Sequence, residues 1–230
     1  MTQTLTLYSH PLASFCQKVL IALYENGAPF DHVVVDLGDR EASAEFFALW
    51  PIGKIPVLRD ARFSRILPET SIIIEYIDQR YPGARPLLPV DESARLEARL
   101  WDRIFDGYVQ ASMQKIVGDR NRPDGAKDPT GVSEAHALLR KSYATIDARM
   151  ADRRWAAGDD FSLADCAAAP ALFYAGIVSP FAADFPHAAA YFDRLAERPS
   201  FARTVAEAQP YFHLFPFVDD IPARFRAGKP

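Results

Sequence analysis

The chain has 230 residues, 49% of them hydrophobic, and its 26 Lys and Arg against 30 Asp and Glu give a formal net charge of −4. This length fits one large domain or two small ones that each bury a core. The near balance of charge gives no general attraction to nucleic acid, no apolar run approaches the roughly 20 residues that cross a bilayer, and no leader is recognisable at residues 1–4. We therefore expect a cytoplasmic protein that binds neither nucleic acid nor membranes.

The first 82 residues alternate short strand-like runs with helix-like ones. Residues 5–8 alternate in hydrophobicity as a strand does, residues 15–23 carry apolar side chains at helical spacing, and residues 30–35 are rich in β-branched side chains. A strand, a helix and a strand in this order predict a βαβ unit with parallel strands. Further along, the patterns predict a helix at 42–50, strands at 55–59 and 63–67, and a helix at 70–80.

Three prolines, Pro82, Pro86 and Pro89, follow this region. They cannot continue a helix, because proline has no amide donor and biases the preceding residue toward extended geometry. Beyond them the predicted helices lie at 91–118, 133–152, 163–174, 188–197 and 201–208. We therefore expect an α/β domain over residues 1–82, a linker over 83–90 and an all-helical domain over 91–230.

Two segments of the α/β part contain candidate binding or catalytic residues. Residues 8–18 pass from a strand to a helix start, where free amides and a partial positive charge stabilise a thiolate or another anion. Ser14 lies at this start, and its hydroxyl either caps the helix or serves such an anion. The second segment contains Lys54, Ile55 and Pro56, and a proline this close to a strand is expected at the strand's first residue or after a cis peptide bond.

A third segment, Glu69 and Thr70, opens the helix predicted over 70–80. The helix amides and the Thr70 hydroxyl can receive a carboxylate while Glu69 attracts an ammonium group, and a zwitterionic α-amino acid head group needs this combination. The alternative is ordinary helix-start chemistry, in which acids and Ser or Thr are common.

In this order the three segments resemble the glutathione-binding half of cytosolic glutathione transferases, with a bacterial-type N-terminal motif similar to that of the theta, zeta and omega classes. The resemblance implies a thioredoxin-like domain of βαβαββα order followed by an all-α helical bundle. It also implies glutathione as co-substrate. Lys54 would contact its glycyl carboxylate, the main chain of Ile55 its cysteinyl part beside a cis Pro56, and Glu69 with Thr70 its γ-glutamyl head.

The helical part carries a further motif of the same family, the capping sequence over residues 161–165. Ser162 would cap the helix predicted over 163–174, and Asp165, three residues later, would accept a hydrogen bond from the Ser162 amide. That helix is apolar almost all round, as a buried helix must be. We therefore predict a structural role for Ser162 and Asp165 rather than a catalytic one.

The sequence departs from the family pattern at Ala13, which occupies the position of the catalytic hydroxyl or thiol in serine-type and cysteine-type members. The neighbouring Ser14 is the candidate to donate a hydrogen bond to the glutathione thiolate. Tyr8, near the position that tyrosine-type members use, is the second candidate, and its alternative role is that of a buried aromatic.

The two cysteines, Cys16 and Cys166, are too few for a disulfide framework, and the five histidines do not fall at metal-ligand spacing. We therefore expect no metal. Cys16 fills only the second place of a Cys-x-x-Cys motif, so we interpret it as a small buried side chain, and we place Cys166 in the core.

The resemblance implies that a hydrophobic electrophile binds between the two domains. Its site would be walled by the loop after the first strand, the middle of the long helix, including Met113, and the C-terminal segment. Positions i, i+3 and i+7 of the long helix share a face. The residues expected there are His10, Pro11, Leu12, Phe105, Tyr108 and Ser112. The alternative for the two aromatics of the long helix is the core of the bundle.

The resemblance implies a glutathione transferase that works as a homodimer and whose bound thiolate attacks a small hydrophobic electrophile. Two alternatives stay open. A non-catalytic glutathione-binding protein of the same fold would have lost the chemistry through Ala13, and a glutathione-dependent thiol oxidoreductase would use Cys16.

Overall fold

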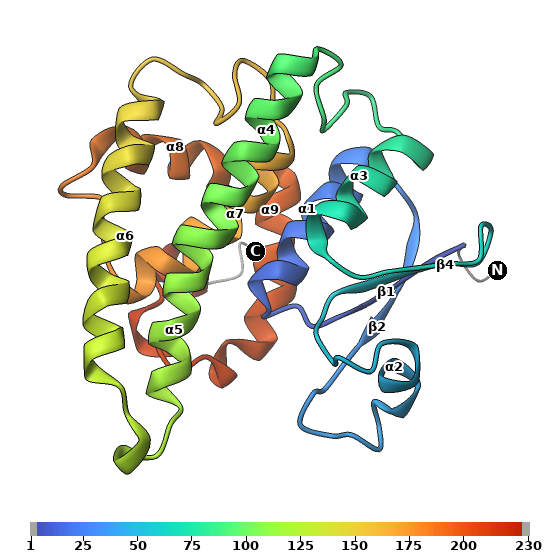
Figure 1. Cartoon of the computed structure of the whole chain (residues 1–230), viewed down its shortest axis with the longest axis horizontal. Helices are drawn as coiled ribbons and strands as arrows, with labels where there is room; N and C mark the ends of the chain where they lie inside the picture. The colour runs from blue at the N-terminus through green and yellow to red at the C-terminus, as the bar shows by residue number, and fades with distance from the viewer. Residues whose placement is uncertain (1–3, 227–230) are drawn as a thin grey trace.

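The computed structural model describes residues 4–226, which form a sheet with flanking helices and a separate bundle of helices (Figure 1). The sheet has four strands in the order β2-β1-β3-β4. β1 (Leu5–Ser9) pairs in parallel with β2 (Phe30–Val34) and antiparallel with β3 (Val57–Asp60), which pairs antiparallel with β4 (Arg65–Leu67). This is the predicted thioredoxin-like sheet, and with the helical bundle that follows it the fold class is confirmed.

Three helices flank the sheet, with α1 (Ser14–Asn26) and α3 (Thr70–Arg80) on one face and α2 (Ala44–Leu49) on the other (Figure 1). α1 ends at Gly27, whose φ of 60° is a left-handed conformation that a residue without Cβ adopts at little cost. The side of the sheet that carries α1 is the side that adjoins the bundle (Figure 1).

The side chains of β1 divide between the two faces of the sheet, because successive strand residues point in opposite directions. Leu5 and Leu7 enter the main core beneath α1, whereas Tyr8 packs with Phe46 of α2 in a separate small cluster. The position of Tyr8 is therefore fixed by strand geometry on the face away from α1.

No helix or strand covers residues 81–91. The carboxylate of Asp78 in α3 accepts hydrogen bonds from the amides of Leu87 and Leu88 at 2.8 and 3.1 Å, and the Leu87 carbonyl accepts one from the Leu163 amide at 2.8 Å. This connection is therefore held by hydrogen bonds to both parts of the chain.

The bundle is built from α-helices joined by short irregular segments (Figure 1). Its helices are α4 (Glu92–Ile104), α5 (Ala111–Arg120), α6 (Pro129–Met150), α7 (Leu163–Val178), α8 (Pro186–Ala196), α9 (Pro199–Ala208) and α10 (Ala223–Arg226). Between α4 and α5 the chain continues as a π-helical segment over Phe105–Gln110. A π-helix has an i to i+5 hydrogen-bond pattern, so it changes which side chains share a face.

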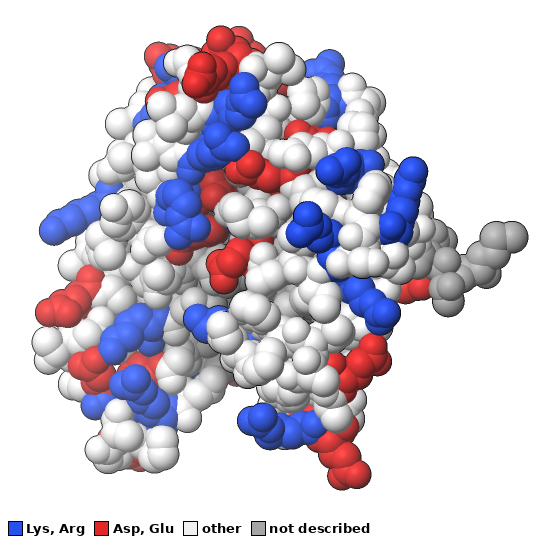
Figure 2. Space-filling view, turned by 45° about the vertical axis from the view of Figure 1, so that its right-hand side comes forward, with Lys and Arg blue, Asp and Glu red and all other residues white. Residues whose placement is uncertain are grey.

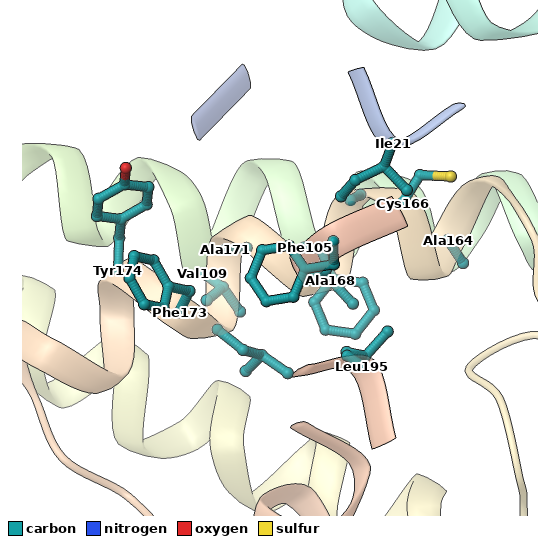
Figure 3. Packing of buried hydrophobic residues seen from close by; sticks show 14 of the residues in the cluster. Ile21, Phe105, Val109, Ala164, Cys166, Ala168, Ala171, Phe173, Tyr174 and Leu195 are labelled. Atoms are coloured by element: carbon teal, nitrogen blue, oxygen red, sulfur yellow. The ribbon is translucent and has the colours of Figure 1, made fainter. Parts of the chain in front are cut away.

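α7 is the buried centre of the bundle. Every residue of this helix except Gly176 and Val178 is buried. Its alanines, including Ala168 and Ala171, allow neighbouring helices to approach closely, and Figure 3 shows Phe105 and Leu195 packed against this small-residue surface. The apolar run of the sequence is therefore explained by burial on all sides.

The predicted capping pair at the start of α7 is present. The Asp165 side chain accepts hydrogen bonds from the Ser162 amide at 2.9 Å and the Ser162 hydroxyl at 3.0 Å. It also accepts bonds from the Ala156 amide at 3.0 Å and the Tyr191 hydroxyl at 2.6 Å. Asp165 is fully buried, so it joins three segments of the bundle and has no access to a substrate.

A buried charged cluster links α1 to the bundle. The Lys18 ammonium lies 2.6 Å from Asp102 Oδ1 and 2.8 Å from Asp106 Oδ2, and all three side chains are almost completely buried. The Ser71 hydroxyl of α3 donates to Asp102 at 2.6 Å and accepts from Lys18 at 3.1 Å. Sequence patterns gave no sign of this cluster, since its members come from α1, α3, α4 and the helical segment that follows α4.

Candidate functional site

Two cavities adjoin the start of α1 and share Ile55. The smaller cavity has a volume of about 200 Å³ and is lined by all five residues predicted to bind glutathione, among others. Its lining residues are Phe15, Trp50, Lys54, Ile55, Pro56, Pro68, Glu69, Thr70, Arg103 and Asp106. The fold therefore brings the second and third sequence segments together on one wall.

The Ile55–Pro56 peptide bond is cis, as expected for a proline placed just ahead of a strand. Pro56 is buried and is followed directly by Val57, the first residue of β3. Proline cannot donate to a strand ladder, which explains why the strand begins only after it.

Glu69 and Thr70 form a sharp turn into α3. Glu69 has φ = 69° and ψ = 112°, a conformation that residues with a Cβ rarely adopt. This turn leaves the Glu69 side chain exposed at the cavity, while Thr70, the first helical residue, is buried at its wall. The unusual backbone conformation of Glu69 therefore occurs where its carboxylate and the N-terminus of α3 both face the smaller cavity.

Arg103 and Asp106 line the same cavity and were not identified from the sequence. They come from the end of α4 and the π-helical segment, and Arg103 donates to Asp106 at 3.2 Å. With Lys54 and Glu69 they give the small cavity two cationic and two anionic side chains. A ligand with both charges meets complementary groups there.

The larger cavity has a volume of about 530 Å³ and lies between the two parts of the chain. Its walls come mainly from residues 10 and 12–14, residues 35–38, α5 and residues 214–216. Figure 2 shows the surface hollowed between the two parts, with basic and acidic side chains interspersed on that face. Most of the lining side chains are apolar, among them Leu12, Met113, Val117 and Phe215.

Ser14 is not the N-cap of α1. The capping position is Ala13, with φ = −78° and ψ = 121°, and Ser14 is the first helical residue. The Ser14 hydroxyl oxygen accepts a hydrogen bond from the side-chain amide of Gln110 in the π-helical segment. Ser14 therefore lines the larger cavity and at the same time bridges the two parts of the chain.

The loop before α1 is held against α7. Gln17 donates to the Pro11 carbonyl at 2.9 Å and to the Tyr174 hydroxyl at 3.1 Å, and Tyr174 donates to the Leu12 carbonyl at 2.7 Å. His10 and Leu12 line the larger cavity, whereas Pro11 is buried and does not. The expectation for Pro11 is wrong, because its contribution is the carbonyl that Gln17 holds.

The expected face of Phe105, Tyr108 and Ser112 does not line the larger cavity. Phe105 is fully buried in the bundle core (Figure 3), Tyr108 is 52% exposed, and Ser112 is buried away from the cavity. The spacing rule assumed 3.6 residues per turn, but the π-helical segment over Phe105–Gln110 rotates the residues out of that register. Met113, which was also expected there, does line the cavity, together with Val117 of α5.

Tyr8, the second catalytic candidate, lines neither cavity. Its hydroxyl donates to Glu45 of α2 at 2.7 Å, and burial together with this bond raises the pKa of Tyr8 above its ordinary value. The alternative role as a buried aromatic is therefore the one observed.

Cys16 is fully buried and accepts a hydrogen bond from the His10 amide at 3.5 Å. Burial raises the pKa of its thiol to about 12. Cys166 is fully buried on α7. Neither sulfur combines the accessibility and the low pKa that a nucleophilic thiol needs.

Within residues 4–226, no group of three or more His, Cys, Asp or Glu side chains is arranged to hold a metal ion. In the same range, none of the helices is both long and apolar enough to span a bilayer.

Comparisons with known proteins identify the family of the chain. The family model "Glutathione S-transferase, N-terminal domain" matches residues 7–85, and "Glutathione S-transferase, C-terminal domain" matches residues 104–199. Glutathione S-transferase 3 of Zea mays is 33% identical over 88% of this chain and 93% of its own length.

FtsZ-localized protein A of Caulobacter vibrioides is also 33% identical, over 89% of this chain and 92% of its own. A solved glutathione S-transferase from Methylobacillus flagellatus, with glutathione bound, is 27% identical and superposes with a TM-score of 0.80 over 87% of this chain and 98% of its own. Strong similarity therefore extends both to proteins named as transferases and to one that is named for its localisation.

Proposed function

The chain belongs to the glutathione S-transferase family, and from this we propose that it binds glutathione in the smaller cavity and transfers its sulfur to a small hydrophobic electrophile held in the larger one. The observation that carries the proposal is the adjacency of the two cavities. They share Ile55, and the first two residues of α1 line one each, Ser14 the larger and Phe15 the smaller.

Glutathione fits the charges of the smaller cavity. In the proposed orientation, the exposed Lys54 faces the glycyl carboxylate, the main chain of Ile55 pairs with the cysteinyl part, and Glu69 with Thr70 holds the γ-glutamyl head group. Because Ile55 borders both cavities, this orientation directs the cysteinyl sulfur toward the larger cavity and the start of α1.

Ser14 is the proposed hydrogen-bond donor to the sulfur. A free thiol with a pKa near 8.5 is only a few per cent ionised at neutral pH, so the protein must favour the thiolate. The helix start and one hydroxyl donor both do so. Gln110 donates to the Ser14 oxygen, which leaves the Ser14 hydroxyl proton free for the sulfur.

The larger cavity suits the second substrate. Its apolar walls hold a hydrophobic body and exclude water around the reacting sulfur, so that the thiolate remains nucleophilic. The sulfur then bonds to the electrophilic carbon, and the electron pair passes to a leaving group or a conjugated acceptor on the same molecule.

A glutathione-binding protein without transferase activity is the second candidate. Ala13 supports it, because this residue has no hydroxyl or thiol where the resemblance expects one. The names of two relatives also support it, FtsZ-localized protein A and a stringent starvation protein A homolog of Coxiella burnetii that is 31% identical. The thiol oxidoreductase has less support, since Cys16 is fully buried.

Replacing Ser14 with alanine is expected to raise the pKa of the bound glutathione thiol by about one to two units, since the hydroxyl donor is lost. Ultraviolet thiolate absorbance of the complex against pH measures this shift. The turnover of 1-chloro-2,4-dinitrobenzene should fall about 10- to 100-fold at neutral pH. Ser112→Ala is the matched control, because Ser112 is equally buried and lines neither cavity.

An unchanged absorbance curve in Ser14→Ala would remove Ser14 from this role and leave the transferase proposal standing. Glutathione binding by calorimetry without turnover of any electrophile would favour the non-catalytic protein. No binding of glutathione at all would contradict both.

We also propose that the chain forms a homodimer through α4 and α3. Leu96 and Leu100 of α4 lie at i and i+4 and are 68% and 49% exposed, and Ile72 of α3 is 53% exposed. The Arg99 guanidinium binds the Glu75 carboxylate through two bonds of 2.8 Å, so the two helices are neighbours. A second copy would cover these apolar side chains.

Changing Leu96 and Leu100 together to glutamate should shift the sedimenting species from two chains to one, because four like charges would meet at the interface. Leu138→Glu on α6, an exposed leucine on another surface, should leave the mass unchanged. An unmodified chain that sediments as a monomer contradicts the proposal.

A further inference from the structure

His10 is held in one orientation on the wall of the larger cavity. The Leu12 amide donates to its Nδ1 atom at 3.2 Å, and its ring meets the Tyr211 ring edge-on with centroids 4.7 Å apart. Its main chain is fixed as well, because its carbonyl accepts from the Ala13 amide at 3.0 Å and its amide donates to Cys16 Sγ at 3.5 Å.

The Leu12 bond decides which ring nitrogen carries the proton. A main-chain amide is only a donor, so the Nδ1 atom that receives it has no hydrogen, and the proton of the neutral imidazole resides on Nε2. Protonation of Nδ1 would break this bond. Burial also lowers the pKa of His10, although the nearby Asp36 acts in the opposite direction.

The Nε2–H is the remaining donor of this ring. Among residues 4–226, the Leu12 amide is the only group that forms a hydrogen bond with a ring nitrogen of His10. The cavity around this residue has apolar side chains, including Leu12, Val35 and Leu214, and one carboxylate, Asp36, which is close enough to act on the imidazole charge. Ser14 lies four residues along the same segment. An oriented neutral donor therefore lies on the wall of a mostly apolar cavity, next to the proposed position of the sulfur.

We propose that His10 is a specificity-determining hydrogen-bond donor, which selects electrophiles whose reactive carbon is conjugated to a carbonyl group. The inference rests on the proposed function, because it requires glutathione as the nucleophile. The class that fits is an α,β-unsaturated ketone or aldehyde with a hydrophobic body.

The reaction balances without a further reactant. The thiolate sulfur bonds to the β-carbon, the π electrons of the carbon–carbon double bond move toward the carbonyl, and the negative charge collects on its oxygen. The His10 Nε2–H donates to that oxygen as the charge develops, which stabilises the transition state more than the ground state. A proton from water then reaches the α-carbon, replacing the one that the thiol released on ionisation, and there is no leaving group.

Two probes that each carry one phenyl ring separate this role from general binding. trans-4-Phenyl-3-buten-2-one develops charge on a carbonyl oxygen, whereas benzyl chloride reacts by displacement and has no carbonyl. Loss of a hydrogen bond to a charged group corresponds to about 10- to 100-fold in rate. His10→Phe, which keeps a ring to pack on Tyr211, should lower the ratio of kcat/KM for the ketone over the chloride by about tenfold or more.

His10→Gln restores an N–H donor of similar reach and should recover much of that ratio. His187→Phe, the same change at an exposed histidine on α8, should leave the ratio as it is. Glutathione binding by calorimetry shows that each variant is folded.

An equal fall in kcat/KM for both probes in His10→Phe, or no fall for either, would overturn the role of His10. A wild-type chain that conjugates benzyl chloride but not the ketone would also overturn it, while leaving the transferase proposal intact. A wild-type chain that binds glutathione and conjugates neither probe would count against both.

Discussion

Lys18→Met is expected to lower the free energy of unfolding by about 3–5 kcal/mol at neutral pH, because it removes the cation from a buried ion cluster. Methionine preserves most of the aliphatic length of lysine, so little of the loss should come from a cavity. The variant keeps the carboxylates of Asp102 and Asp106, which are almost completely buried and have lost the ammonium group that they shared. Arg103 at 3.2 Å reaches only Asp106, and it is largely exposed.

The loss should shrink in acid. Burial raises the pKa of Asp106 even in the intact protein, against the opposing charge of Lys18, and removal of Lys18 raises it further. A carboxyl whose pKa is higher in the folded state than in the unfolded state favours folding below the unfolded value, near 4, and this contribution is lost as pH rises through the folded value. The variant should therefore approach the wild type as the pH falls through the raised folded-state pKa of Asp106 toward about 4.

Urea unfolding of both proteins at several pH values measures the effect. Lys141→Met, the same change at an exposed position of α6, should alter stability by less than about 0.5 kcal/mol. A Lys18→Met variant as stable as this control at neutral pH would show that the cluster does not hold the two parts of the chain together.

The local features of the fold could be predicted from the sequence because short-range chemistry determines them. Pro56 needs a place outside the strand ladder, and Asp165 follows Ser162 at the spacing of a capping box. Lys54, Ile55, Glu69 and Thr70 lie within 17 residues of one another, and the order of strands and helices brings them to one cavity.

The contacts between the two parts of the chain could not be predicted in this way. Lys18 and Asp106 are 88 residues apart, and Ser14 and Gln110 are 96 apart, so no local pattern relates them. The π-helical segment places Asp106 opposite Lys18 and Gln110 opposite Ser14. The two residues of each element are four positions apart in the sequence. The same segment explains why Phe105 does not line the larger cavity as predicted, because that prediction assumed a regular α-helix.

Asp165→Ala is expected to destabilise the protein by about 3–6 kcal/mol, because it leaves several buried donors without an acceptor at once. The carboxylate accepts from the Ala156 amide, the Tyr191 hydroxyl, and both the amide and the hydroxyl of Ser162. Each buried unsatisfied donor costs about 1–3 kcal/mol, and the hydroxyls can turn to other partners while the amides cannot.

The matched control is Asp147→Ala, since Asp147 also accepts from two main-chain amides, those of His187 at 2.7 Å and Ala188 at 3.0 Å. That site opens to solvent, where water can replace the carboxylate, so the loss should be about 1 kcal/mol, as for an exposed helix cap. Urea midpoints of the two variants compare the sites directly. Equal losses would mean that neither the burial of Asp165 nor its larger number of donors adds to its contribution to stability.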